Sequence, residues 1–184
     1  MECKYARFKT EKGLLQEIIH LLTYDVYPKV SAIGGKKIHP DIDILQIEKD
    51  FHNQPLLIGY EIKLIKFNKK NGELSWNSFY SGIGQALMYL KNGIHRSSLI
   101  LGFHESIYDD ELIERFYNQL QNEKELLKRI IGEYVSINMY LYKRGYLVSI
   151  VESRSIFYSF DKEVELLFNE IIQGRFTFDR KLKK

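Results

Sequence analysis

The chain has 184 residues, which corresponds to one domain of ordinary size, since domains average roughly 150 residues. Apolar residues make up 45% of it and charged residues 28%, a composition that is typical of a globular protein and excludes a mainly disordered or fibrous one. The longest apolar stretches, such as residues 56–58, are far shorter than the run of about 20 that a membrane-spanning helix needs. Residues 1–12 also lack the apolar region of a secretory signal. We therefore expect no membrane association and no secretion.

The cysteine content and the net charge further restrict the classes of protein to which this chain can belong. A single cysteine, Cys3, excludes an intrachain disulfide and a cysteine-built metal site, so a reducing cytoplasmic location is expected, in the host cell if a mobile element encodes the chain. The net charge of +3 is too small to demonstrate a nucleic-acid partner. Lysines and arginines do cluster at residues 63–70 and in a basic tail at residues 175–184. Solvated surface lysines are the plain alternative for each cluster.

The first third of the chain is predicted to form a helix and three strands. Thr10 is a suitable N-cap, and leucines and isoleucines then recur at helical spacing up to Leu22. Period-2 alternation and apolar runs predict strands at residues 29–33, 41–48 and 56–65. The last two form an antiparallel hairpin, whose second strand is apolar on both faces and therefore expected to be buried.

The remainder alternates helices with strands. Helices are predicted at residues 76–90, from 109 to about 131, and at 162–172; strands are predicted at 98–103, 134–142 and 146–151. This succession predicts an α/β fold in which a central mixed β-sheet carries α-helices on both faces. We expect one domain over residues 1–184, with a core at about 10–151 and a C-terminal helix and basic tail at 160–184.

The residues with the clearest chemical potential lie on the predicted hairpin. Glu61 and Lys63 are two apart on one strand, so their side chains project from the same face. An ionised carboxylate in so apolar a strand is costly unless a counter-charge or a metal compensates it. If Asp43 on the neighbouring strand lies close, a divalent cation would relieve the repulsion, and oxygen ligands favour Mg²⁺ or Mn²⁺. A purely structural Glu–Lys pair is the alternative.

The following helix adds Gln85 and Tyr89, four apart and therefore on one face. With them, residues 11–103 resemble the PD-(D/E)XK nuclease superfamily. Pro40-Asp41-Ile42-Asp43 is similar to its PD element and Glu61-Ile62-Lys63 to its EXK element. Gln85 with Tyr89 resembles the Q-x-x-x-Y motif of RecB-type and Holliday-junction-resolvase-like members. Each motif is short, and their order and predicted strand or helix contexts make the match.

The resemblance implies a restriction-endonuclease-like core and metal-dependent hydrolysis of phosphodiester bonds in DNA. Asp43, Glu61 and the main-chain carbonyl of Ile62 would bind Mg²⁺ or Mn²⁺, and Lys63 would position or deprotonate the attacking water or stabilise negative charge. Gln85 would orient Lys63, the water or the substrate. Tyr89 would support Gln85 or contact the DNA backbone. The lysines expected to contact DNA phosphates are Lys66, Lys69 and Lys70.

Two choices of metal ligand stay open. Asp41 follows the proline, as the motif's name suggests. Asp43 is expected to lie closer to the position opposite Glu61 in the hairpin, and it is preferred as the ligand. The superfamily often adds a glutamate from the first helix, for which we favour Glu17 over Glu11, although a solvated helix glutamate explains either. His39 near this site is most simply a loop histidine.

The leading functional hypothesis is thus a Mg²⁺-dependent deoxyribonuclease, with a homodimer expected because small members of the superfamily often dimerise. The alternative is a catalytically silent nucleic-acid-binding or assembly module with the same fold. The motifs distinguish neither duplex from single-stranded, branched or RNA substrates, nor exonuclease from endonuclease action.

Overall fold

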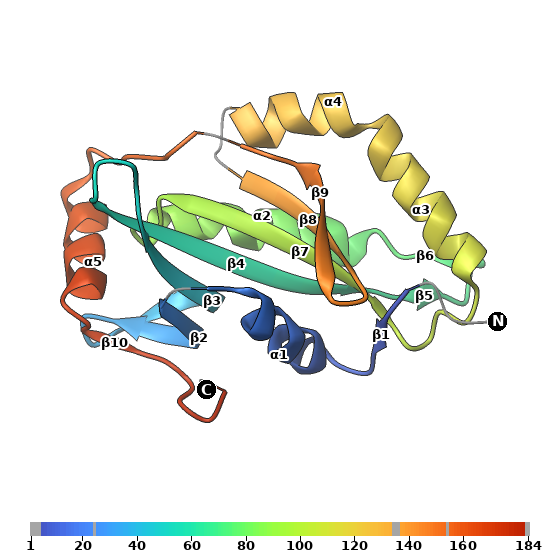
Figure 1. The fold of residues 1–184 in the computed structure, drawn as a ribbon, viewed down its shortest axis with the longest axis horizontal. Helices are drawn as coiled ribbons and strands as arrows, with labels where there is room; N and C mark the ends of the chain where they lie inside the picture. Colours follow the sequence, from blue (N-terminus) through green and yellow to red (C-terminus); the bar gives the residue numbers. More distant parts are fainter. Residues whose placement is uncertain (1–4, 24, 134–136, 154, 183–184) are drawn as a thin grey trace.

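A computed structural model describes residues 5–23, 25–133, 137–153 and 155–182, and it shows an α/β fold built on one large mixed sheet (Figure 1). In these residues the sheet has eight strands, in the spatial order β10–β2–β3–β4–β7–β8–β9 with β1 beside β7. They are β1 Arg7–Phe8, β2 Asp25–Ile33, β3 Lys36–Lys49, β4 Pro55–Ile65, β7 Arg96–His104, β8 Ile137–Lys143, β9 Tyr146–Val151 and β10 Phe176–Thr177. A separate two-stranded ribbon pairs β5, Phe67–Asn68, with β6, Glu73–Leu74.

Helices cover both faces of the sheet, as the sequence predicts. They are α1 Glu11–Leu21, α2 Asn77–Lys91, α3 Asp110–Asn122, α4 Lys124–Leu127 and α5 Lys162–Ile172, and a π-helical turn, Lys128–Glu133, follows α4. Leu14 of α1 packs with Ile62 and Leu64 of β4, whereas α2 packs against Leu99 of β7. Because alternate residues of neighbouring strands point to opposite faces, α1 and α2 lie on opposite sides of the sheet, an arrangement visible in Figure 1. None of the described helices is long and apolar enough to cross a membrane.

The predicted hairpin of β3 and β4 is confirmed, and it is the centre of the sheet. β3 is antiparallel to both β2 and β4, and its pairing with β4 runs from Lys49 opposite Pro55 to Ile44 opposite Tyr60. β4 is in turn parallel to β7. Seven consecutive residues of β4, from Leu56 to Ile62, are buried, because the strand lies between two neighbours and between helices on both faces.

Some boundaries differ from the prediction. The helix expected from residue 109 to about 131 breaks after Asn122, since Lys124 stands where the buried stripe of Ile113, Phe116 and Leu120 requires its next apolar residue. β2 begins at Asp25 and passes through Pro28. A proline is tolerated there because β10 pairs only with Ala32 and Ile33, which leaves the Pro28 region of β2 at the edge of the sheet.

The C-terminal basic tail is partly structured, because residues 176–177 form β10 beside β2. Its last lysines, Lys183 and Lys184, and the first three residues (134–136) of the strand predicted at 134–142 lie outside the described residues.

Candidate active site

The predicted site lies where β3 and β4 separate. Their paired stretch ends at Ile44 opposite Tyr60, so Asp43 and Glu61 are the next residue on each strand. Beyond this point the side chain of Asp43, rather than the main chain of β3, bonds to β4: its Oδ2 accepts a hydrogen bond of 2.8 Å from the N–H of Ile62. The two acids are 6% and 2% exposed. The structure therefore brings both predicted carboxylates together in a buried position.

Tyr89 of α2 reaches this pair from the helix that covers it. Its side chain is fully buried, and its hydroxyl donates to Oε2 of Glu61. The hydroxyl oxygen of Tyr89 also accepts a hydrogen bond of 3.2 Å from the main-chain N–H of Asp43 and lies 3.1 Å from the carbonyl oxygen of Asp41. Since 0% of Tyr89 is exposed, its side chain supports the site from within the core, and its contact with DNA stays a prediction. Tyr89 instead connects α2 to both strands that carry the acids.

Lys63 points into the same site from β4. Its Nζ lies 2.5 Å from Oε1 of Glu61, and its side chain is 14% exposed. The stem of Lys63 passes close to Gly82 of α2, where a Cβ would lie 2.9 Å from Cγ of Lys63. Gly82 thus lets the helix approach the strand at the point where the lysine leaves it.

Burial sets the protonation of these groups. Desolvation, and then the charge of Asp43, raise the pKa of Glu61 to about 7, although hydrogen bonds from Lys63 and Tyr89 oppose the shift. Burial lowers the pKa of Lys63, but the hydrogen bond and charge of Glu61 outweigh it and leave that pKa raised. Lys63 is therefore an ammonium group that donates hydrogen bonds near neutral pH, rather than a base.

Sequence reasoning missed one residue of the site, Lys29 on β2. Its Nζ forms an ion pair with Oδ1 of Asp43. Pro28 pairs with Ile44 and Val30 with Ile42, so Lys29 lies opposite Asp43 across β2 and β3. The only signal available was this register, which requires β2 to continue through Pro28.

Gln85 lies one turn before Tyr89 on α2 and is half-buried. Its Oε1 is buried and has no hydrogen-bond partner among the described residues. A buried amide oxygen without a partner is unfavourable, so this atom is available to a ligand, a water or a rotated Lys63.

The remaining predicted ligands are placed away from the acids. Asp41 is exposed, and of its groups the main-chain carbonyl is the one that approaches Tyr89. Glu17 accepts a hydrogen bond of 3.3 Å from the hydroxyl of Tyr142 on β8. The preference for Glu17 is therefore not supported, since Glu11 is the glutamate of α1 whose charge acts on Lys63. His39 is exposed.

The predicted DNA-contacting lysines follow the end of β4. Lys66, Lys69 and Lys70 are all exposed, and Lys69 and Lys70 lie in the turn between β5 and β6. Lys66 is three residues beyond Lys63, or roughly 10 Å along an extended chain. The contact of these lysines with DNA stays a prediction.

The donors at the site fit a small divalent cation. The N–H and C=O of one strand residue point to the same side, so the carbonyl of Ile62 faces Asp43 as its N–H does. Two carboxylates and one carbonyl suit Mg²⁺, which usually keeps several waters. Among the described residues no three His, Cys, Asp or Glu side chains gather around one point, so an all-side-chain cage such as a zinc site is not indicated there.

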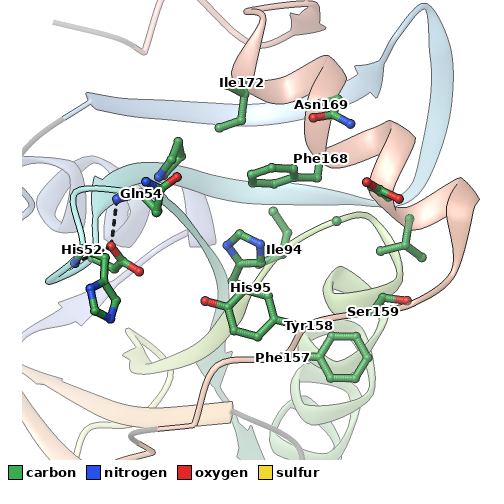
Figure 2. A pocket seen from close by; sticks show the side chains of 15 residues that line it. His52, Gln54, Ile94, His95, Phe157, Tyr158, Ser159, Phe168, Asn169 and Ile172 are labelled. Atoms are coloured by element: carbon green, nitrogen blue, oxygen red, sulfur yellow. Dashed lines mark hydrogen bonds between the residues drawn. The ribbon is translucent and has the colours of Figure 1, made fainter.

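A separate cavity of about 550 Å³ lies between the β3–β4 turn, the start of β7 and α5. Figure 2 shows His95, Tyr158 and Phe168 around it, and none of the predicted site residues lines it. Nδ1 of His95 accepts from the N–H of Leu57 at 3.3 Å, and burial lowers the pKa of this histidine. The cavity therefore holds a neutral imidazole within an aromatic lining, apart from the paired acids.

Comparisons with protein-family models and with curated proteins found no match to this chain.

Proposed function

We propose that this chain is a Mg²⁺- or Mn²⁺-dependent nuclease with a restriction-endonuclease-like core, which hydrolyses phosphodiester bonds of DNA. The observation that carries the proposal is the convergence of Asp43, Glu61 and Lys63 at the point where β3 and β4 separate. Burial raises the pKa of Glu61, and the neighbouring charge of Asp43 raises it further. A divalent cation between the two carboxylates would remove their mutual repulsion and compensate the cost of burying them.

Asp43, Glu61 and the carbonyl of Ile62 would hold the cation. When bound, Mg²⁺ or Mn²⁺ supplies a Lewis acid that withdraws charge from the phosphate and favours an ionised water. The protein's own residues have distinct tasks. Tyr89 holds the carboxylate of Glu61 and the main chain of Asp43 in one arrangement. This fixed geometry lowers the reorganisation needed during the reaction.

Lys63 would stabilise charge on the reacting phosphate or orient the attacking water. Because it is protonated and hydrogen-bonded to Glu61, it can donate to an oxygen that becomes more negative in the transition state. Gln85, whose amide oxygen has no partner among the described residues, can accept from Lys63 or the water. Lys66, Lys69 and Lys70 would hold the DNA backbone beyond the site.

Cleavage assays test the proposal directly. Linear, supercoiled, single-stranded and four-way-junction DNA would be incubated with Mg²⁺, Mn²⁺ or EDTA. We expect metal-dependent cleavage by the wild type and by the Asp41→Asn variant, whose acid is exposed. Asp43→Asn and Glu61→Gln should be inactive. Absence of cleavage, together with no Mn²⁺-dependent rise in Tm, would instead indicate a silent module.

A further inference from the structure

Lys29 has an unusual backbone conformation for a residue inside a strand. Its φ is +51°, in the left-handed region that residues with a Cβ rarely adopt. The pairing of β2 with β3 is regular from Asp25 to Pro28 and shifts between Val30 and Ala32. A strained residue of this kind persists only where the surrounding structure imposes it, and such residues concentrate at functional sites. Here the strained residue carries the ammonium group that meets Asp43.

The site holds two acids and two lysines, each acid with its own partner. Lys63 pairs with Glu61, and Lys29 pairs with Asp43. The two lysines differ in how firmly they are held. The side chain of Lys63 is 14% exposed and passes beside Gly82, whereas that of Lys29 is 40% exposed. Lys29 can therefore withdraw into solvent without leaving a cavity in the core.

The two oxygens of Asp43 are also used differently. Oδ2 is held by the N–H of Ile62, which belongs to the framework of β4. Oδ1 is held by Lys29. A cation that also binds Glu61 and the carbonyl of Ile62 must be coordinated by a carboxylate oxygen of Asp43. The oxygen that does not bond to Ile62 is Oδ1, and the positive charge of Lys29 lies beside it. Two cations this close to one carboxylate oxygen repel each other.

We infer that Lys29 is a displaceable counter-ion of Asp43, which occupies the carboxylate in the metal-free protein and is exchanged for the divalent cation. This inference rests on the proposed function and adds a residue to the same site. The ammonium group holds the carboxylate of Asp43 in place before the metal arrives. On metal binding it leaves Oδ1 and becomes available at the surface of the site. Lys29 is thus a positioning residue, acting through Asp43.

Metal affinity without DNA tests the exchange. Mn²⁺ binding would be measured by calorimetry at about pH 8, above the pKa of about 7 of Glu61. Lys29→Met should bind Mn²⁺ about tenfold more tightly than the wild type, because no charge-assisted hydrogen bond must be broken first. Its Tm without metal should be lower, since Asp43 loses its counter-ion. Lys29→Arg should resemble the wild type, and so should Lys37→Met, which removes an exposed lysine of β3.

A second measurement uses the wild type alone and does not depend on a variant folding. Lysine amines would be acetylated under limiting conditions and located by mass spectrometry, with and without Mg²⁺. Labelling of Lys29 should rise several-fold on metal addition, whereas that of Lys37 should not change. The exchange would be overturned if Lys29→Met and the wild type bound Mn²⁺ equally tightly, or if the labelling of Lys29 were the same with and without Mg²⁺. Either result would leave the proposed function standing. Failure of the wild type to bind Mn²⁺ at all would overturn both.

Discussion

The hydroxyl of Tyr89 on α2 donates to the carboxylate of Glu61 on β4 and accepts from the main chain of Asp43 on β3. One side-chain oxygen thus contacts both strands that carry the acids, at the point where those strands separate. The ring below it is fully buried, which fixes the hydroxyl from the helix side. Tyr89 therefore sets the relative position of the two carboxylates without any contact to solvent.

Removing this hydroxyl should loosen the site while leaving the core intact. Tyr89→Phe keeps the buried ring but leaves Glu61 without one donor and the N–H of Asp43 without its acceptor. We expect unfolding free energy to fall by about 1–3 kcal/mol, the cost of unsatisfied buried groups. Cleavage should fall by about tenfold, since the acids lose their fixed geometry. Tyr142→Phe, whose hydroxyl meets the exposed Glu17, is the matched control and should change neither quantity. Equal effects of the two variants would contradict this role of Tyr89.

Two glycines of α2 give a second test. A Cβ at Gly82 would lie 2.6 Å from Leu99 and 2.9 Å from the stem of Lys63, whereas nothing lies within 4 Å of one at Gly84. Gly82→Ala should therefore push α2 away from β4, destabilise the protein by about 1–3 kcal/mol and reduce cleavage. Gly84→Ala, on the exposed side of the same helix, should stabilise it by about 0.5–1 kcal/mol and leave cleavage unchanged. Chemical denaturation and the cleavage assay measure both, and a harmless Gly82→Ala would show that close approach of the helix is not required.

Much of this arrangement follows from patterns that a sequence displays. The apolar run of β4 and the alternation in β3 predict the hairpin, and the spacing of Gln85 and Tyr89 places both on one helical face. The burial of Tyr89 was not predictable in this way. Its ring fits because Gly59 of β4 has no side chain, and a Cβ there would lie 2.9 Å from the ring. That complementarity joins residues on different elements, so no local periodicity reveals it.

Lys29 was missed, and Glu17 was preferred over Glu11, for related reasons. The left-handed φ of Lys29 and the continuation of β2 through Pro28 accompany the pairing of β2 with β3, which no local pattern in residues 25–33 reveals. The periodicity of α1 identifies its buried stripe, but the choice between Glu11 and Glu17 requires the rotation of the helix relative to the sheet. Tertiary contacts set both features.

The raised pKa of Glu61 predicts how stability depends on pH. With a folded pKa of about 7 against an ordinary value of 4.5, the folded protein binds this proton more tightly than the unfolded chain. The contribution is fully present below about pH 4.5 and is lost as the pH rises through 7. Metal-free protein should therefore lose about 1–3 kcal/mol of unfolding free energy over this range, relative to Glu61→Gln. Urea denaturation at several pH values measures this, and parallel curves for the two proteins would contradict it.

The same ionisation should control metal affinity. Glu61 binds a cation only after it loses its proton, so Mn²⁺ affinity should rise as the pH increases through about 7. Calorimetry across this range checks the slope. Glu61→Gln should show weak binding that varies much less with pH, and a steep dependence that survives in this variant would assign the proton to another group.

The last prediction concerns Lys63 and separates chemistry from binding. Lys63→Ala should leave DNA affinity in Ca²⁺ nearly unchanged, because one charge among several phosphate contacts contributes little to binding. Cleavage should nevertheless fall by about 10²-fold or more, the usual scale for loss of a charge-stabilising donor. Removing charge at Lys69 or Lys70 should do the opposite: it should weaken binding and flatten its salt dependence, with little effect on saturated turnover. If Lys63→Ala lost affinity and rate equally, Lys63 would be an ordinary phosphate contact, and unchanged cleavage would remove the nuclease interpretation of Glu61-Ile62-Lys63. Since Lys63 pairs directly with Glu61, the Mn²⁺ affinity of this variant should be measured alongside, so that a lost metal site is not mistaken for a lost donor.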